Sequence, residues 1–319
     1  MSDTLLDVRD LVVEFPTGDG RTVHAVSGIS FEIARGETLG LVGESGCGKS
    51  TTARAIMQLP RPTGGAVTLE GENLTGLRGG ALRQARRRFQ MIFQDPIASL
   101  NPRRTVQEIV EAPLIIAGEK DEAGRQTRVR DMVEQIGLNP DQALERRPHE
   151  FSGGQCQRIS IARAVILEPE LLICDEPVSA LDVSVQAQIL NLLEDMKQRY
   201  GLTMLFISHD LSVVKHISDR VAVMYLGKIC ELAPSDTLYR EPLHPYTAAL
   251  LSAVPEPDPD VPAKTVDLMS GELPSPLDPP SGCRFRTRCP RAQARCAEEV
   301  PAVEERRDGH FVACHFPLA

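Results

Sequence analysis

The chain has 319 residues, of which 42% are hydrophobic and 25% charged, so it is long enough to bury one large or two medium-sized cores. No apolar run approaches the roughly 18 residues that a membrane-spanning helix needs, and the acidic segment 1–12 does not suit a signal peptide. The formal net charge of −9 argues against a nucleic-acid partner, because proteins that bind phosphate backbones carry an excess of Lys and Arg.

The N-terminal part of the chain predicts a small antiparallel β-subdomain. Apolar and polar residues alternate over 5–15 and over 22–33, as in strands with one buried face. A short apolar strand over 38–42 then leads into a glycine-rich loop and a helix over 51–59.

The middle of the chain predicts an α/β core with a helical insert. Between about residues 82 and 150 the pattern becomes 3.6-periodic and charged, and we place a helical subdomain at about 82–165. Its core candidates are Val106, Ile109, Val110, Val133 and Ile136. Strands then alternate with helices, at 171–174, 203–207 and 220–225 for the strands and at 183–200 and 210–217 for the helices. This order is typical of an α/β fold with a mainly parallel core sheet.

The C-terminal part predicts a linker followed by a small module. Eight of the 24 prolines fall between Pro255 and Pro280, a density that prevents regular structure. The residues after them are rich in Cys and poor in large apolar side chains, so burial alone could hardly fold them. We therefore expect a main domain at 1–254, a linker at 255–280 and a Cys-rich module at 281–319.

A phosphate-binding loop lies between the strand over 38–42 and the helix that follows it. The residues that fit the pattern G-x-x-x-x-G-K-[ST] are Gly43-Glu44-Ser45-Gly46-Cys47-Gly48-Lys49-Ser50-Thr51. The glycines let backbone N–H groups wrap a triphosphate, and Lys49 supplies a point charge for the β- and γ-phosphates. Ser50 is the expected hydroxyl ligand of Mg²⁺. A glycine-rich turn that matches by chance is the alternative, but further residues of an ATPase follow in the chain.

Two carboxylates follow an apolar strand at 171–174. Asp175 and Glu176 lie at its C-terminal end, and Pro177 stops the strand there. We expect Asp175 to hold Mg²⁺ through its water shell and Glu176 to polarise the water that attacks the γ-phosphate. Taken alone, such a pair is more often a strand cap, and its pairing with the phosphate loop favours catalysis.

The sequence Phe151-Ser152-Gly153-Gly154-Gln155 precedes a helix-like run, and it resembles the signature that separates ABC (ATP-binding cassette) ATPases from other phosphate-loop proteins. The resemblance implies a P-loop NTPase cassette fold, with an antiparallel β-subdomain and an α-helical subdomain. It also implies that the signature residues, including Gln155, lie at a helix N-terminus. From there they contact the ATP that is held by the opposite subunit. A Ser N-cap with flexible glycines is the structural alternative. Many members have Arg after the signature, where this chain has Cys156.

Four further positions resemble family residues. Gln94 resembles the Q-loop glutamine, which senses γ-phosphate and joins Ser50 and Asp175 around Mg²⁺, although alone it would be a plain turn residue. Asp182 resembles the D-loop aspartate that bridges two subunits, and His209 the switch histidine on the γ-phosphate. Phe15 is at the place of the aromatic residue that stacks on adenine, and a buried strand Phe is the other interpretation. With Glu176, His209 and Gln94 present, we expect this subunit to hydrolyse ATP.

The residues after the cassette also have a family likeness. His244-Pro245-Tyr246-Thr247, the Pro-rich linker and the Cys-containing tail resemble ATPase subunits of oligopeptide, dipeptide and nickel importers. The resemblance implies a second ATPase, which is a paralogue or another copy of this chain, two transmembrane permeases and an extracytoplasmic binding protein. It implies a peripheral place on the cytoplasmic face of the inner membrane, with ATP and Mg²⁺ as cofactors. A nickel or other small-solute importer, an exporter motor and a soluble non-transport ABC protein are the alternatives.

Four cysteines lie in the last 37 residues, at Cys283, Cys289, Cys296 and Cys314. Four soft thiolates suit an iron–sulfur cluster or zinc, and the paired Cys-x2-4-Cys knuckles typical of zinc ribbons are absent. The spacing and the resemblance favour a structural [4Fe-4S] cluster, with Zn²⁺ or metal-free thiols as the alternatives.

Overall fold

The computed structural model describes residues 3–253 and 272–319, and the chain folds into two compact units. The first unit, called the helical unit below, holds residues 3–5, 33–37 and 76–206. The second, called the phosphate-loop unit, holds residues 6–32, 38–75 and the described part of 207–319. Each is described by itself. Most of the linker predicted at 255–280 lies outside the described residues.

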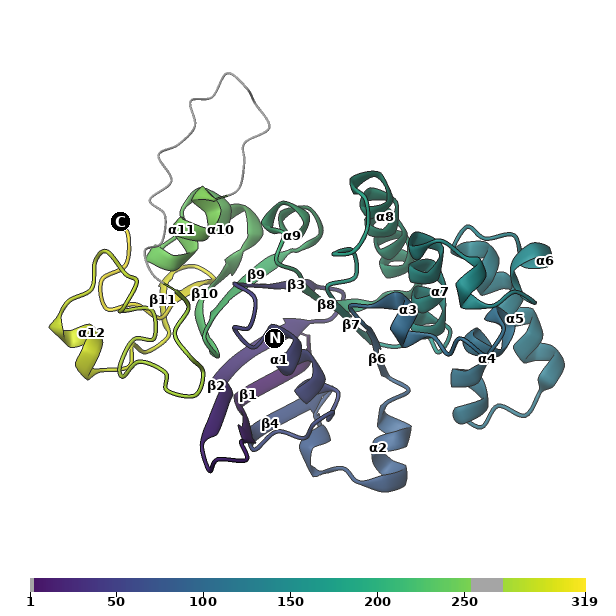
Figure 1. The fold of residues 1–319 in the computed structure, drawn as a ribbon, viewed down its shortest axis with the longest axis horizontal. Helices are drawn as coiled ribbons and strands as arrows, with labels where there is room; N and C mark the ends of the chain where they lie inside the picture. The colour runs from purple at the N-terminus through teal and green to yellow at the C-terminus, as the bar shows by residue number, and fades with distance from the viewer. Residues whose placement is uncertain (1–2, 254–271) are drawn as a thin grey trace, which may run out of the picture. The chain divides into compact units, whose positions relative to one another are not determined.

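The helical unit combines a short parallel ladder with a group of helices. β6 (Phe89–Ile92) pairs in parallel with β7 (Leu171–Asp175), and β8 (Thr203–Ile207) is the next strand of the same sheet. The helices are α2 (Gly79–Ala85), α3 (Pro96–Ser99), α4 (Val106–Ile116), α5 (Glu122–Gln135), α6 (Pro140–Ala143), α7 (Gly153–Val165) and α8 (Val183–Tyr200). In Figure 1 the helices α4 to α7 form one group in teal and blue. The predicted core residues of this insert are all buried.

The phosphate-loop unit contains the antiparallel sheet that the opening sequence predicts. Its strand order is β2 (Thr22–Ala34), β1 (Thr4–Pro16), β4 (Gly64–Leu69) and β5 (Glu72–Asn73). β1 and β4 run antiparallel with Leu6 opposite Leu69 and Val8 opposite Val67, and all four side chains are buried. Alternation with period two therefore places one apolar face of this sheet in the core.

A second set of strands in the same unit positions the phosphate loop. β3 (Thr38–Val42) pairs in parallel with β9 (Arg220–Tyr225), and β9 pairs antiparallel with β10 (Lys228–Pro234). The helices of this unit are α1 (Lys49–Ile56), α9 (Leu211–Ile217), α10 (Ser235–Arg240), α11 (Pro245–Ser252) and α12 (Ala294–Glu298). Every residue of β3 is buried, so the core holds the start of the phosphate loop in place.

The tail joins this sheet through two strands that the sequence did not predict. β12 (His310–Val312) pairs antiparallel with β10, and β11 (Glu304–Arg307) pairs with β12 at the edge. The Cys-rich tail therefore belongs to the phosphate-loop unit, and the boundaries predicted at 254 and 281 stay predictions.

A buried carboxylate connects the tail to the sheet. Glu231 of β10 is 1% exposed and accepts hydrogen bonds from the backbone N–H groups of Leu243 (2.6 Å) and His244 (2.9 Å). Its Oε1 lies 2.6 Å from Nε2 of His310, which is fully buried. A buried carboxylate needs such partners, because an unsatisfied one destabilises the folded state.

We expect His310→Ala to destabilise the protein by about 2–3 kcal/mol, because it leaves Glu231 short of one partner in a buried place. The measurement is the urea midpoint of unfolding. His315→Ala is the matched control, because His315 is half-buried and its Nε2 lies 3.0 Å from the backbone carbonyl oxygen of Glu299, not beside a buried carboxylate. An equal shift for both variants would contradict the argument.

The fold class expected from the sequence is confirmed, with further local differences besides β11 and β12. The region expected to be helical from residue 82 contains the strand β6, and the sequence also missed β4 and β10. None of the described helices is long and apolar enough to cross a membrane.

Candidate ATP-binding and hydrolysis site

The phosphate loop takes a backbone shape that only glycine permits at two positions. Gly43 has φ of 150°, and a Cβ there would lie 2.1 Å from the carbonyl oxygen of Met224. Gly48 has φ of 109°, and its Cβ would lie 2.3 Å from the carbonyl oxygen of Ala25. The loop is thus pressed against neighbouring backbone, with Gly48 as the N-cap of α1. Residues 43–51 thus have the glycine-dependent backbone shape that the predicted anion cradle requires.

Lys49 is folded back onto its own loop. Its side chain is 5% exposed, and Nζ donates to the carbonyl oxygens of Gly43 (2.7 Å) and Glu44 (3.0 Å). Cys47, behind it, is buried, and burial raises the pKa of its thiol. Cys47 is therefore a neutral packing residue, and the buried ammonium is the charge available to phosphate.

Two more predicted residues lie in the phosphate-loop unit. Phe15 is near the end of β1 and is 38% exposed, which leaves its ring accessible for stacking. His209 is exposed in the turn before α9, whose first N–H groups, those of Ser212 (2.8 Å) and Val213 (3.3 Å), are capped by Asp210. The cap fixes the helix start directly after His209.

The predicted catalytic carboxylates and the Q-loop glutamine lie in the helical unit. Asp175 ends β7 and is fully buried, and Glu176 follows with φ of 49°, a left-handed conformation that side chains rarely adopt. Gln94, after β6, donates from Nε2 to Oε2 of Glu176 at 3.0 Å. β6 and β7 are paired strands, so their carboxyl ends bring Gln94 and Glu176 together.

The signature forms the N-terminus of α7. Ser152 is its N-cap, and a capping box joins Ser152 Oγ to the N–H of Gln155 (3.3 Å) and Gln155 Oε1 to the N–H of Ser152 (3.0 Å). A Cβ on Gly154 would lie 2.6 Å from Cγ1 of Val185, and one on Gly153 would meet Leu181 at 3.8 Å. The glycines therefore let this helix approach α8 closely. The capping interpretation and the family role both fit the same geometry.

The segment before α8 presents the D-loop residue to solvent. Asp182 is the exposed N-cap of α8, and no hydrogen bond from its side chain caps the helix. The next residue, Val183, is 82% exposed. A single exposed apolar side chain is common on protein surfaces, so Val183 alone does not mark an interface.

The four tail cysteines lie close enough to influence one another, but they do not form a ligand set. Charge on Cys283, Cys289 and Cys296 raises the pKa of Cys314, after the larger effect of burial, to about 11. All four thiols are free in the structure. Within residues 3–253 and 272–319, no group of three or more His, Cys, Asp or Glu side chains is placed to hold a metal ion. The expected cluster or zinc ligand set is therefore not present in the described part of the structure.

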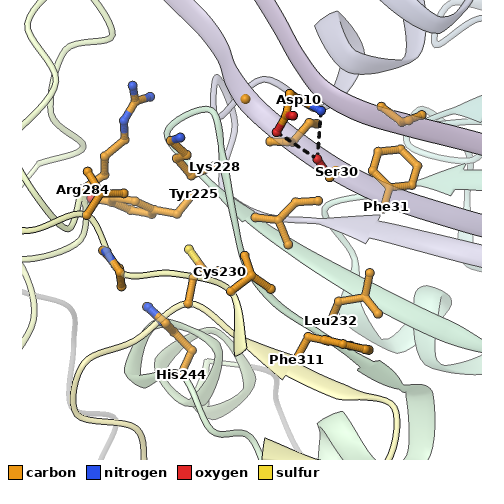
Figure 2. A pocket seen from close by; sticks show the side chains of 18 of the residues that line it. Asp10, Ser30, Phe31, Tyr225, Lys228, Cys230, Leu232, His244, Arg284 and Phe311 are labelled. Atoms are coloured by element: carbon orange, nitrogen blue, oxygen red, sulfur yellow. Dashed lines mark hydrogen bonds between the residues drawn. The ribbon is translucent and has the colours of Figure 1, made fainter. Parts of the chain in front are cut away.

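A cavity of about 760 Å³ separates part of the tail from the strands of the phosphate-loop unit. Figure 2 shows Lys228, Cys230, His244 and Arg284 around it. Burial lowers the pKa of Lys228, and it lowers that of His244 to about 4, so His244 is neutral. The tail therefore does not pack continuously onto the other residues of the phosphate-loop unit. The contacts that surround the cavity attach it.

Two residues that touch the phosphate loop carried no assigned role in the sequence analysis. Tyr246 OH accepts a hydrogen bond from the N–H of Glu44 at 2.9 Å. Arg288, from the tail, donates to both carboxylate oxygens of Glu44, at 2.8 and 3.1 Å. Both residues lie in segments with the importer-like resemblance, Tyr246 in the motif at 244–247 and Arg288 in the Cys-containing tail. Nothing in those segments indicated a contact with the phosphate loop.

Comparisons with known proteins identify the family of the chain. The chain matches the family described as ABC transporter over residues 26–179, and the family described as oligopeptide/dipeptide transporter, C-terminal region, over residues 230–296. It is 56% identical over 313 residues to a putative oligopeptide transport ATP-binding protein, YkfD, of Bacillus subtilis, covering 98% of this chain and 95% of YkfD. It is 55% identical over 322 residues to the oligopeptide transport ATP-binding protein OppF of Escherichia coli, covering 97% and 95%.

A solved structure shows the same fold. The ATP-binding cassette MJ0796, a dimer in a post-hydrolysis state with ADP and Pi, superposes with a TM-score of 0.66 at 27% identity, covering 72% of this chain and 99% of that one. The matched family regions, the near full-length relatives and the signature-capped helix α7 agree, and the chain belongs to the family of ABC transporter ATP-binding proteins.

Proposed function

We propose that this chain is the ATP-hydrolysing subunit that powers the import of oligopeptides or dipeptides through an ABC transporter. The observation that carries the proposal is the identity of 55–56% with oligopeptide transport ATP-binding proteins over nearly the whole chain. That identity includes the C-terminal region described for oligopeptide and dipeptide transporters. ATP hydrolysis is the activity of the family, and peptide import is the finer proposal.

The family resemblance assigns the parts of phosphoryl transfer to water among residues of each unit. The loop 43–51 cradles the triphosphate, and Lys49 exchanges its two carbonyl partners for phosphate oxygens. Glu176, oriented by Gln94, polarises the attacking water. His209 contacts the γ-phosphate, and Phe15 stacks on adenine. The signature at 152–155 contacts the ATP held by the opposite subunit.

Magnesium suits the donors that the family resemblance assigns to it. Ser50, Gln94 and Asp175 offer hydroxyl, amide and carboxylate oxygens, and Mg²⁺ prefers oxygen ligands. When bound with ATP, the ion would neutralise charge on the β- and γ-phosphates.

We infer that the working form is a pair of cassettes. The signature helix starts with N–H groups at an exposed Ser152, and beyond it Asp182 and Val183 are exposed. These surfaces fit a second cassette, a paralogue or another copy of this chain, that completes the ATP site. Two transmembrane permeases and an extracytoplasmic binding protein complete the importer, with this chain on the cytoplasmic face of the membrane.

The transport assignment is tested with labelled peptides. Cells that carry the chain should accumulate a radiolabelled tri- or pentapeptide, and cells that carry Glu176→Gln should not. Uptake of radioactive nickel, measured in parallel, separates the peptide importer from a nickel importer. If Glu176→Gln cells kept peptide uptake but lost nickel uptake, the chain would belong to a nickel importer. If the chain were recovered from solubilised membranes without permeases, a non-transport ABC ATPase would be favoured.

We also propose that the tail cysteines bind a metal, with a [4Fe-4S] cluster ahead of Zn²⁺. The support is the presence of four cysteines in a small tail that is poor in large apolar side chains. The described residues do not form a ready ligand set. Anaerobically purified protein should be brown and absorb broadly in the visible range. A colourless sample with stoichiometric zinc would favour zinc, and a colourless sample without metal would favour free thiols.

A further inference from the structure

We propose that Arg288 of the Cys-rich tail is a positioning residue for the phosphate loop, which it holds through Glu44 and so sets the affinity for ATP. The proposal rests on nucleotide binding at residues 43–51 and adds the tail to that site.

The first observation is a two-point ion pair between the tail and the loop. Nη1 of Arg288 lies 2.8 Å from Oε2 of Glu44, and Nη2 lies 3.1 Å from Oε1. The Arg288 side chain is only 7% exposed and that of Glu44 is 24% exposed. Bidentate pairs between guanidinium and carboxylate fix orientation as well as distance, and low exposure limits screening by water.

The environment of Arg288 supports a fixed contact. Its hydrogen bonds with Glu44 raise the pKa of Arg288 above its ordinary value. The guanidinium also lies 5.8 Å from the centre of the Tyr225 ring, with Nη1 3.5 Å from the Tyr225 hydroxyl. The guanidinium is therefore held from two directions.

The second observation is that Glu44 is also held at its backbone. Its N–H donates to the hydroxyl of Tyr246, which is fully buried. Its carbonyl oxygen accepts from Nζ of Lys49. Glu44 thus connects the tail to the lysine that meets the phosphates. A loop fixed before ATP arrives loses less conformational freedom on binding, which increases affinity.

The third observation is that the tail segment carrying Arg288 is anchored beside the loop. Phe285 is 1% exposed, and its ring centre lies 5.2 Å from that of Tyr225 and 5.3 Å from that of Tyr246. Arg284 donates to the carbonyl of Leu226 and, at 2.8 Å, to Ser27 Oγ. Figure 2 shows Arg284 and Tyr225 at the same side of the cavity. An aromatic anchor and two arginines therefore fasten residues 284–288 to the phosphate-loop unit.

The test compares ATP affinity in full-length variants. Arg288→Ala should weaken equilibrium binding of ATP with Mg²⁺ by about tenfold, because it frees Glu44 and leaves its partly buried carboxylate unpaired. The turnover rate at saturating ATP should stay within about twofold. A purely structural role would lower the amount of folded protein and turnover together, without a selective change in KM.

The matched control is Arg286→Ala, which removes another arginine of the same segment. The Arg286 side chain donates to Ser281 of the tail, from Nε to the carbonyl oxygen at 2.9 Å and from Nη2 to Oγ at 3.3 Å. ATP affinity should be unchanged in this variant. Arg288→Lys keeps the positive charge but loses the two-point contact with the carboxylate. Its ATP affinity should lie between those of the parent and Arg288→Ala.

A double-mutant series keeps the proposal testable if Arg288→Ala folds poorly. Arg288→Glu combined with Glu44→Arg should bind ATP more tightly than either single variant, because the pair is restored with its charges exchanged. A parent that binds no ATP would refute the ATPase assignment itself. A parent that binds ATP beside an Arg288→Ala variant of equal affinity, or beside an Arg286→Ala variant weakened as much, would refute only the role of Arg288.

Discussion

Glu176→Gln should reduce steady-state ATP hydrolysis by about 10²–10⁴-fold, the range that a positioned general base contributes. The amide keeps the shape of the side chain, and its oxygen can still accept the hydrogen bond from Gln94 that the structure shows at 3.0 Å. What the amide lacks is the ability to draw a proton from water. The measurements are phosphate release at saturating ATP and ATP affinity, which should stay within about threefold of the parent. ATP should also trap a stable dimer of this variant.

The matched control for this variant is Glu168→Gln. Glu168 shares the rare left-handed backbone of Glu176, with φ of 52° against 49°, and lies in the same unit after α7. Its ion pair with Arg128, at 3.6 Å, is exposed. The control should therefore hydrolyse ATP at the parental rate. If Glu176→Gln also turned over at that rate, Glu176 would not be the catalytic base.

Lys49→Ala should weaken ATP binding itself, by on the order of 100-fold, because it removes a charged donor to two phosphates. The loop would also lose the bonds from Nζ to the carbonyl oxygens of Gly43 and Glu44, so its shape without nucleotide would be less fixed. Equilibrium binding of ATP measures the effect.

Lys120→Ala is the control for the lysine variant, because Lys120 is exposed in the helical unit and has no part in the loop. Its affinity for ATP should equal that of the parent. Equal affinity in Lys49→Ala would show that the cradle binds triphosphate through its backbone alone.

The buried strands of the core were predictable because their signal is local. β3, β8 and β9 have the predicted bounds, since each is a short apolar run that is buried along nearly all its length. β6 was missed because its four residues follow a run of three arginines at 86–88 and look like part of the charged helical insert. Its identity as a strand depends on pairing with β7, which lies about 80 residues later in the chain.

The candidate site shows the same difference between local features, which the sequence predicts, and long-range contacts, which it does not. The glycines of the phosphate loop, the Ser152 cap and the order Asp175 then Glu176 follow from neighbouring residues, so the motifs revealed them. The contact between Gln94 and Glu176 spans 82 positions and that between Glu44 and Arg288 spans 244. Pairs so distant leave no periodic trace, and only the folded chain brings them together.

The outermost strand of the sheet, β11, is protected against pairing with a further strand. β11 reads Glu-Glu-Arg-Arg and is exposed at all four positions, and charged residues of this kind discourage an extra strand from adding to a sheet. A shortened chain that stopped before residue 304 would lack β11 and β12. It would expose the backbone N–H and C=O groups of β10 that now pair with β12. We expect such a fragment to aggregate through this exposed strand edge. A soluble fragment therefore needs the last sixteen residues, 304–319, or other charged residues at the edge strand.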